Sequence, residues 1–286
     1  LNGTYNLSTT MPAYEIRPLR LRILEILLAV DKVCREHGLR YYLWAGTLLG
    51  AVRHKGFIPW DDDVDICMPR ADYDTLMAHA KEWLPAPYEA MSAETNEKYP
   101  GSFGKIIDSS TTLIERAHYA YLSGIYIDVF PIDGVPQSAW RRRLHFMRFE
   151  FYKRIVYFLH RDPYKHGRGP SSWLPLLCRK CFTHEGVQQK LRRLMLKYNY
   201  EDAQLVADYD DGLKGVFAKT LLGEPTPVSF EGHELKGVAQ YDRYLTQKYG
   251  DYMQIPATNQ QRQHNFYYLD YNQPYSEYKD QRKFRL

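Results

Sequence analysis

The chain has 286 residues, of which 44% are hydrophobic and 25% charged, a composition that fits a globular protein with a substantial core. Its net charge of +4 is too small to indicate a nucleic-acid binder, and four cysteines are too few for a disulfide scaffold. No apolar run reaches the roughly 18 residues that a membrane span needs. The printed chain begins at Leu1 and shows no signal peptide, so we expect a cytoplasmic protein.

The first predicted element is a helix with a broad apolar face. It begins near Pro18, a residue that suits a first helical turn, and it stops at Gly38. Residues 41–45 then predict a short strand that leads to Gly46 and Thr47. We expect the helix to pack on the sheet and to have a structural role.

Residues 44–67 are the most informative stretch, because they hold four carboxylates within five positions. Asp61, Asp63 and Asp65 are two residues apart, so on a strand their side chains share one face. Asp62 would point to the other face. Three acids on one face repel each other unless a cation lies between them, and oxygen ligands suit Mg²⁺ or Mn²⁺.

A phosphate site is predicted directly before these acids. A glycine turn that opens a helix offers backbone N–H groups, and Gly46 and Thr47 supply such a turn with a hydroxyl. Arg53, His54 and Lys55 follow with further donors. A phosphate-binding turn beside a carboxylate metal site is typical of phosphoryl transfer. The alternative, a solvated acidic turn, is disfavoured because the acids run directly into an apolar segment.

The chain between the acids and residue 124 alternates short elements. We predict a helix over 69–83, a strand over 88–91 and two short strands around a polar turn over 104–115. Lys105 has two equally weighted interpretations. It reaches a nucleotide phosphate, or it is a surface lysine at a strand end.

Residues 124–134 predict an apolar strand with Asp128 in its middle. A lone carboxylate in a buried strand needs a partner or a metal ion, so Asp128 is a candidate site residue. Asp133 precedes Gly134, and we expect it to shape a turn instead.

Residues 137–181 are basic and aromatic at helical spacing. Such helices lie on an anionic membrane surface, or they pack on the core with a solvated basic face, and we slightly favour the second interpretation. Cys178, Cys181 and His184 have the spacing of zinc ligands, but a fourth ligand is missing and ordinary thiols are favoured.

The remaining chain predicts a helix over 184–200, an acidic surface turn over 208–212 and a small β segment over 216–235. A further helix ends at Gly250. We expect the segment after it to return over the site, where His264 binds phosphate or a ligand acid, or else has a capping or core role.

Residues 46–66 resemble the signature of the LicD family, which comprises phosphocholine transferases and relatives such as the fukutin-related proteins. Residues 127–133, and 249–256 with Arg262 and His264, resemble further family segments, so the resemblance covers about residues 20–270. It implies an α+β, nucleotidyltransferase-like fold with a mixed β-sheet core flanked by helices. The expected parts are a catalytic core, a basic and aromatic helical subdomain, and a C-terminal segment that packs back on the core (18–136, 137–215 and 216–286).

The resemblance also implies roles for site residues. Asp63, Asp65 and Asp128 match the family's catalytic acids and, together with Asp61, would hold Mg²⁺ or Mn²⁺. The expected substrate- and phosphate-binding residues are Gly46, Thr47, Arg53, His54, Lys55, Lys105 and His264.

The implied reaction is transfer of a phospho-alcohol, phosphocholine from CDP-choline in the first instance, to a hydroxyl of a cell-surface glycan such as lipopolysaccharide or teichoic acid. A lipid-linked acceptor would bring peripheral contact with the inner face of the cytoplasmic membrane. Two alternatives stay open. One is a nucleotidyltransferase that acts on a small molecule or protein. The other is a non-catalytic, envelope-associated binding protein, against which the intact acids argue.

Overall fold

The computed structural model describes residues 14–164, 168–261, 263–280 and 282. The helices in this part of the chain are α1 (Ile16–His37), α2 (Ala45–His54), α3 (Arg70–Trp83), α4 (Ala139–His160), α5 (Pro170–Cys181), α6 (His184–Met195) and α7 (Tyr241–Tyr249). The strands are β1 (Tyr42–Leu43), β2 (Asp65–Pro69), β3 (Tyr88–Met91), β4 (Gly104–Ile114), β5 (Ser123–Gly134), β6 (Leu205–Asp208), β7 (Val216–Ala218), β8 (Thr226–Phe230), β9 (His233–Gly237) and β10 (Tyr268–Asp270).

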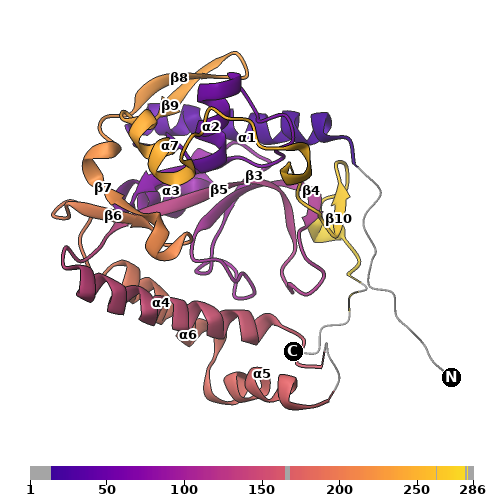
Figure 1. The fold of residues 1–286 in the computed structure, drawn as a ribbon. Helices are drawn as coiled ribbons and strands as arrows, with labels where there is room; N and C mark the ends of the chain where they lie inside the picture. Colours follow the sequence, from indigo (N-terminus) through magenta and orange to yellow (C-terminus); the bar gives the residue numbers. More distant parts are fainter. Residues whose placement is uncertain (1–13, 165–167, 262, 281, 283–286) are drawn as a thin grey trace.

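One mixed sheet forms the centre of the molecule. Its main path runs β1–β2–β5–β4–β10, with β3 added on β4 and with β6 and β7 added on β5. β2 and β5 are parallel, whereas the other neighbours are antiparallel. Figure 1 shows the sheet curled, with helices around it and β8 and β9 as a separate hairpin. The predicted α+β class with a mixed sheet flanked by helices is confirmed.

Helix α1 illustrates how the sequence pattern produces the core. Its buried residues recur every three or four positions, so they line one face that packs against β5 and β4. Gly38 ends the helix in the left-handed conformation with φ 67°, and its N–H donates to the carbonyl of Cys34. The predicted helix and its glycine stop are confirmed. The helix begins at Ile16, two residues before Pro18.

A second apolar cluster lies under the sheet, where α4 packs along α6 and α5. It joins Phe149 of α4, Leu191 of α6 and Tyr209, the residue that follows β6. Two loops, 92–103 and 115–122, project from the sheet toward this helical layer (Figure 1). The domain boundaries given above stay a prediction.

The structure corrects three of the predicted elements. The segment 104–115 forms one long strand with a bulge, not two strands around a turn, because its polar residues bond to neighbouring chain: Ser109 Oγ donates to the Pro87 carbonyl and Thr111 Oγ1 accepts the Ile125 N–H. Helix α6 stops at Met195 instead of reaching residue 200. Asp208, expected in a surface turn, ends strand β6 and is buried.

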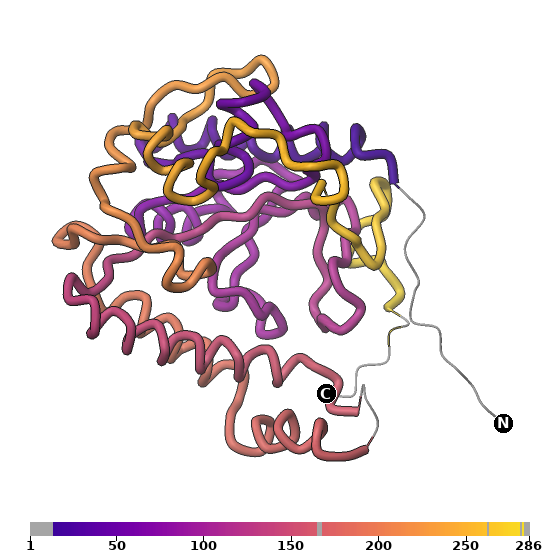
Figure 2. Tube along the Cα trace, viewed as in Figure 1, coloured from indigo at the N-terminus to yellow at the C-terminus, as the bar shows by residue number. Residues whose placement is uncertain are grey.

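The chain after α7 returns across the molecule. Gly250 ends α7 with φ 72°, as predicted. Figure 2 shows the following segment running back past α2 to β10, which pairs antiparallel with β4. Arg262, which belongs to the C-terminal family resemblance, lies outside the described residues.

Candidate active site

Two strands bring acids from separate segments together. Asp65 opens β2 and lies directly opposite Asp128 in the parallel pair of β2 and β5. The N–H of Asp128 donates to the Val64 carbonyl at 2.9 Å, which fixes this register. Paired residues of adjacent strands, about 4.8 Å apart, project their side chains from the same face. The carboxyl groups of Asp65 and Asp128 therefore lie side by side.

The acids around this pair carry a surplus of negative charge. Burial and the neighbouring Asp63 raise the pKa of Asp65 well above its usual range. The same two causes raise the pKa of Asp61 to about 8. Burial raises the pKa of Asp128 to about 7, although Lys105 beside it acts in the opposite direction. Carboxyl oxygens are the ligands that a hard divalent cation prefers, and such a cation would relieve this repulsion, although no three of these four acids have oxygens within 4.8 Å of one another in the structure.

Lys105 lies inside the site and is only 3% exposed. Its Nζ is 2.7 Å from Asp128 Oδ1 and 3.0 Å from Glu115 Oε1, and it lies 3.2 Å from the centre of the Tyr126 ring. The surface interpretation of this lysine is therefore wrong. Its predicted contact with a phosphate stays a prediction, since the ammonium already pairs with two carboxylates.

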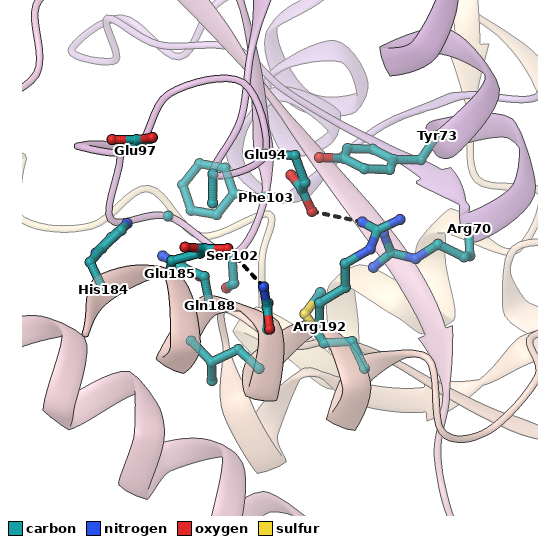
Figure 3. A pocket seen from close by; sticks show the side chains of 15 residues that line it. Arg70, Tyr73, Glu94, Glu97, Ser102, Phe103, His184, Glu185, Gln188 and Arg192 are labelled. Carbon is teal, nitrogen blue, oxygen red and sulfur yellow. Dashed lines mark hydrogen bonds and ion pairs between the residues drawn. The ribbon is translucent and has the colours of Figure 1, made fainter. Parts of the chain in front are cut away.

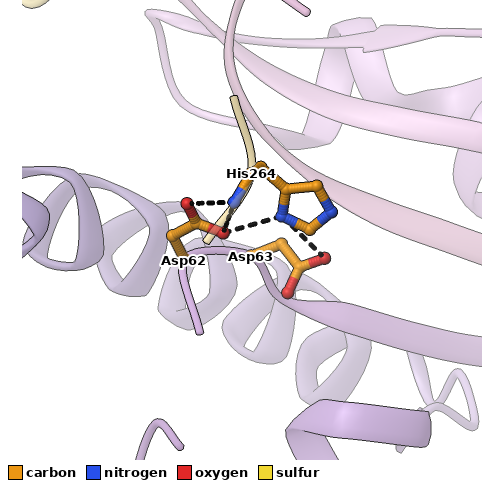
Figure 4. A group of neighbouring side chains, drawn as sticks. All are labelled: Asp62, Asp63 and His264. Atoms are coloured by element: carbon orange, nitrogen blue, oxygen red, sulfur yellow. Dashed lines mark hydrogen bonds and ion pairs between the residues drawn. The ribbon is translucent and has the colours of Figure 1, made fainter. Parts of the chain in front are cut away.

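Asp62 points toward the C-terminal segment and forms a separate ion pair, drawn in Figure 4. It accepts hydrogen bonds from His264 Nδ1 at 2.7 Å and from the His264 N–H at 3.0 Å, and it also accepts one from the Tyr14 hydroxyl. The bond to Asp62 raises the pKa of His264 to about 9, so the imidazole is protonated at neutral pH. Its Nδ1 is 3.9 Å from Asp63 Oδ2.

Asp62, Asp63 and His264 are close enough to hold a metal ion, and they are the single such group found among the described residues. Their hydrogen bonds argue against it. Asp62 already accepts hydrogen bonds from three donors, and His264 Nδ1 is one of these donors. We therefore assign the group as an ion pair that places one positive charge beside Asp63.

The first turn of α2 lies against the acids. The helix begins at Ala45, whose φ of 44° is strained for a residue with a side chain, so Gly46 and Thr47 fall within the first turn instead of preceding it. A Cβ on Gly46 would lie 3.1 Å from Asp61 Oδ2, closer than ordinary van der Waals contact, so a side chain there would push against this carboxylate. Thr47 Oγ1 accepts the Asp65 N–H at 2.8 Å and fastens the start of β2.

The basic residues after this turn have other partners. Arg53 Nη1 donates to the Tyr252 carbonyl at 2.7 Å, and Arg53 Nε donates to His54 Nε2 at 2.9 Å. Burial lowers the pKa of both Arg53 and His54. Lys55 caps α2 with φ 63° and is exposed. Arg53 thus anchors the C-terminal segment, and the phosphate contacts of the three residues stay predictions.

Asp133 and Asp208 show what the sequence did and did not reveal. The predicted turn at Asp133 is wrong, because Asp133 and Gly134 lie within strand β5. Asp133 instead accepts bonds from Arg70 Nε at 2.8 Å and Nη2 at 2.6 Å. Asp208 accepts the Trp44 indole N–H at 2.9 Å, and burial raises its pKa to about 6. Sequence reasoning missed Asp208. The apolar residues that precede it were the available signal for a buried strand.

A cavity of about 350 Å³ opens between α3, the 92–103 loop and α6 (Figure 3). The ring of Phe103 lies at its edge and packs 4.5 Å from the ring of Phe130, which is two residues beyond Asp128 on the same face of β5. The cavity therefore adjoins the acid face. Its main polar and aromatic lining residues are Arg70, Tyr73, Glu94, Phe103, Gln188 and Arg192.

Two further expectations concern cysteine and the membrane. Cys178 is buried in the helical layer and Cys181 is exposed, and neither belongs to the group that could hold a metal ion within the described chain. In the same part of the chain, no helix combines the length and the apolar character that crossing a bilayer requires.

Comparison with known proteins supports an enzyme of the phosphotransferase class. Residues 38–166 match the family model described as LicD/FKTN/FKRP, nucleotidyltransferase domain. The chain is 28% identical over 266 residues to the lipopolysaccharide cholinephosphotransferase LicD of Haemophilus influenzae, an alignment that covers 89% of this chain and 97% of that protein. A 68-residue stretch is 46% identical to ribitol 5-phosphate transferase FKRP of mouse and human, covering 22% of this chain and 14% of FKRP. The chain is thus similar to LicD-type transferases, over nearly its whole length in one case and over residues 38–166 in the family model.

Proposed function

We propose that this protein transfers phosphocholine from CDP-choline to a hydroxyl of a cell-surface glycan and releases CMP. One observation carries the proposal: Asp65 and Asp128 are paired in register beside Asp63, in a chain that aligns with nearly the whole of a cholinephosphotransferase. The FKRP relationship makes CDP-ribitol the second donor to test.

In this proposal Asp63, Asp65 and Asp128, with Asp61, are the residues that hold Mg²⁺ or Mn²⁺. When bound, such an ion supplies positive charge to the donor's diphosphate. The protonated His264 lies beside Asp63 and would donate a hydrogen bond from Nε2 to a phosphoryl oxygen. The first turn of α2 would offer its backbone N–H groups to the same diphosphate.

Asp128 is the proposed general base. With a pKa near 7 it can accept the proton of the acceptor hydroxyl at neutral pH, and Lys105 at 2.7 Å holds its carboxylate in place. The acceptor oxygen then bonds to the phosphorus that carries choline. The bond from that phosphorus to the bridging oxygen breaks, and CMP leaves with this oxygen.

We place the acceptor sugar in the cavity beside Phe103. An aromatic ring at the edge and amide and charged side chains around it suit a polyhydroxylated ring. Gln188 lines the cavity and donates to the Pro100 carbonyl at 3.1 Å. Gln188→Ala is expected to raise KM for the glycan and to leave KM for the donor unchanged.

The deciding experiment measures CMP release with Mn²⁺ or Mg²⁺ from four donors: CDP-choline, CDP-ethanolamine, CDP-glycerol and CDP-ribitol. Each is tested with and without candidate glycans. We expect one donor to give glycan-dependent release that Asp65→Asn abolishes. No release from any donor by folded protein would contradict the proposal and favour a non-catalytic binding protein.

Two radiolabels separate transfer of the phospho-alcohol from transfer of a nucleotide. Label in choline should appear in the glycan, and label in the cytosine base should stay in CMP. Base label in the product would contradict the proposal and favour the nucleotidyltransferase alternative.

A further inference from the structure

Helix α4 is apolar on two opposite faces. Its inner face packs Phe146, Phe149 and Val156 into the cluster shared with α6. On the other side, Trp140 is 66% exposed, and Met147 and Phe151 are 64% and 57% exposed. The outer stripe is Trp140, Leu144, Met147 and Phe151. Steps of four, three and four residues place these side chains on one helix face, turned away from the core.

Helix α5 repeats the arrangement on a smaller scale. Its buried residues are Ser172, Pro175 and Cys178. On the opposite side Trp173 is 67% exposed and Leu177 is 57% exposed. Figure 1 shows α4 and α5 in the outer helical layer, away from the sheet. Two neighbouring helices therefore each present a tryptophan and further large apolar side chains to the outside.

The residues around the apolar stripe of α4 are basic. Arg143, Arg148 and Arg154 are exposed and lie close to the stripe on the helical wheel, and Glu150 is the one acidic residue within α4. Helix α5 contains no acidic residue, and its Lys180 is exposed, whereas Arg179 donates to the Leu159 and Arg161 carbonyls. Solvation alone explains exposed arginines, but it does not explain large aromatic residues between them.

We infer that the outer faces of α4 and α5 form a docking surface for an anionic lipid bilayer. Tryptophan, phenylalanine and methionine side chains would enter the interface, and the arginines would contact the acidic headgroups. The charge argues against a second copy of this chain, because arginines would then face arginines across the contact. The inference does not depend on the proposed transfer reaction.

The test is co-sedimentation of the full chain with vesicles of phosphatidylcholine alone and of phosphatidylcholine with about one third phosphatidylglycerol. We expect binding to the anionic vesicles that decreases with added salt. The variants Met147→Ser/Phe151→Ser and Arg143→Glu/Arg148→Glu should each lower this binding at least tenfold. All four side chains are exposed, so thermal unfolding should match the wild type.

Control variants carry single changes of the same kind, apolar to serine or basic to glutamate, elsewhere on the surface. Leu21→Ser on α1, where the leucine is 54% exposed, and Lys81→Glu on α3 should bind vesicles like the wild type. Equal binding to neutral and anionic vesicles, or unchanged binding of the α4 variants, would overturn the inference. A wild-type dimer that Met147→Ser/Phe151→Ser converts to a monomer, without vesicle binding, would overturn it too and assign the face to a second copy.

Discussion

Strand β5 carries two carboxylates whose surroundings differ. Asp133, at its C-terminal end, receives two hydrogen bonds from the single guanidinium of Arg70. Asp128, in the middle of the strand, shares Lys105 with Glu115 and lies beside Asp65. The negative charge of a carboxylate paired with an arginine is neutralised within the fold. A carboxylate crowded by other acids leaves excess negative charge, which favours the binding of a cation.

Substitutions of the paired and of the crowded carboxylates should therefore affect stability and activity differently. Removing one partner of a matched buried pair leaves a charge without compensation, which destabilises the fold. Removing one of several crowded acids relieves repulsion, so the fold tolerates it although the site does not.

Asp65→Asn and Asp128→Asn should each lower kcat/KM by about 10³-fold or more, because each removes a proposed metal ligand or the base. The thermal unfolding midpoint should stay the same or rise, because repulsion among the acids decreases. Transfer assays and thermal melts on the same samples test both parts. A loss of activity that merely follows a loss of folded protein would contradict the account.

Asp133→Asn should destabilise the protein by about 3–5 kcal/mol, since the buried Arg70 would keep only the partly exposed Asp74, 3.3 Å away, as an anionic partner. Urea unfolding measures this change. The double variant Arg70→Met/Asp133→Leu should recover part of the loss, because no buried charge remains. A cost below about 1 kcal/mol for Asp133→Asn would show that the pair is not needed.

Acid should destabilise the helical layer through His145 and His160, whose pKa values burial lowers to about 4. The unfolded chain binds protons below its ordinary histidine pKa of 6.5 and the folded chain does not. Stability is therefore present above pH 6.5 and lost as pH falls toward 4, by about 1–2 kcal/mol per histidine at pH 5. The variant His145→Gln should lose less stability than the wild type between pH 7 and pH 5. Urea unfolding of both proteins at the two pH values measures this difference. An identical pH dependence in the two proteins would contradict the prediction.

The smallest expected effect concerns His264, the positive group beside Asp63. His264→Gln keeps a side-chain donor for Asp62 and removes the charge, so KM for the donor should rise about tenfold with little change in kcat. Steady-state kinetics in both substrates measure this. A fall in kcat with constant KM would instead place His264 in the chemical step.

Local pattern was enough to predict much of the molecule. The apolar periodicity of α1, its glycine stop and the run from Pro69 to Trp83 define helices without tertiary information. The isolated acid at Asp128 in an apolar strand, and the alternating acids before β2, directed attention to the face that the two strands share.

Contacts between distant residues were beyond the sequence pattern. Asp62 and His264 are 202 positions apart, and Trp44 and Asp208 are 164 positions apart. Local residue spacing therefore predicts neither hydrogen bond. Lys105 was ambiguous for the same reason, because its burial depends on Glu115 and Asp128 meeting across two strands. Local signals fix helices and strands, whereas charge pairing follows only from the assembled sheet.

The central claim is that Asp65, with Asp63 and Asp128, holds a divalent cation, and Mn²⁺ titration followed by electron paramagnetic resonance tests it most directly. The wild type should bind Mn²⁺ saturably in the presence of CDP-choline. Asp65→Asn should lose that binding, whereas Asp62→Asn should keep it because Asp62 pairs with His264. Binding that survives in Asp65→Asn but disappears in Asp62→Asn would contradict the account.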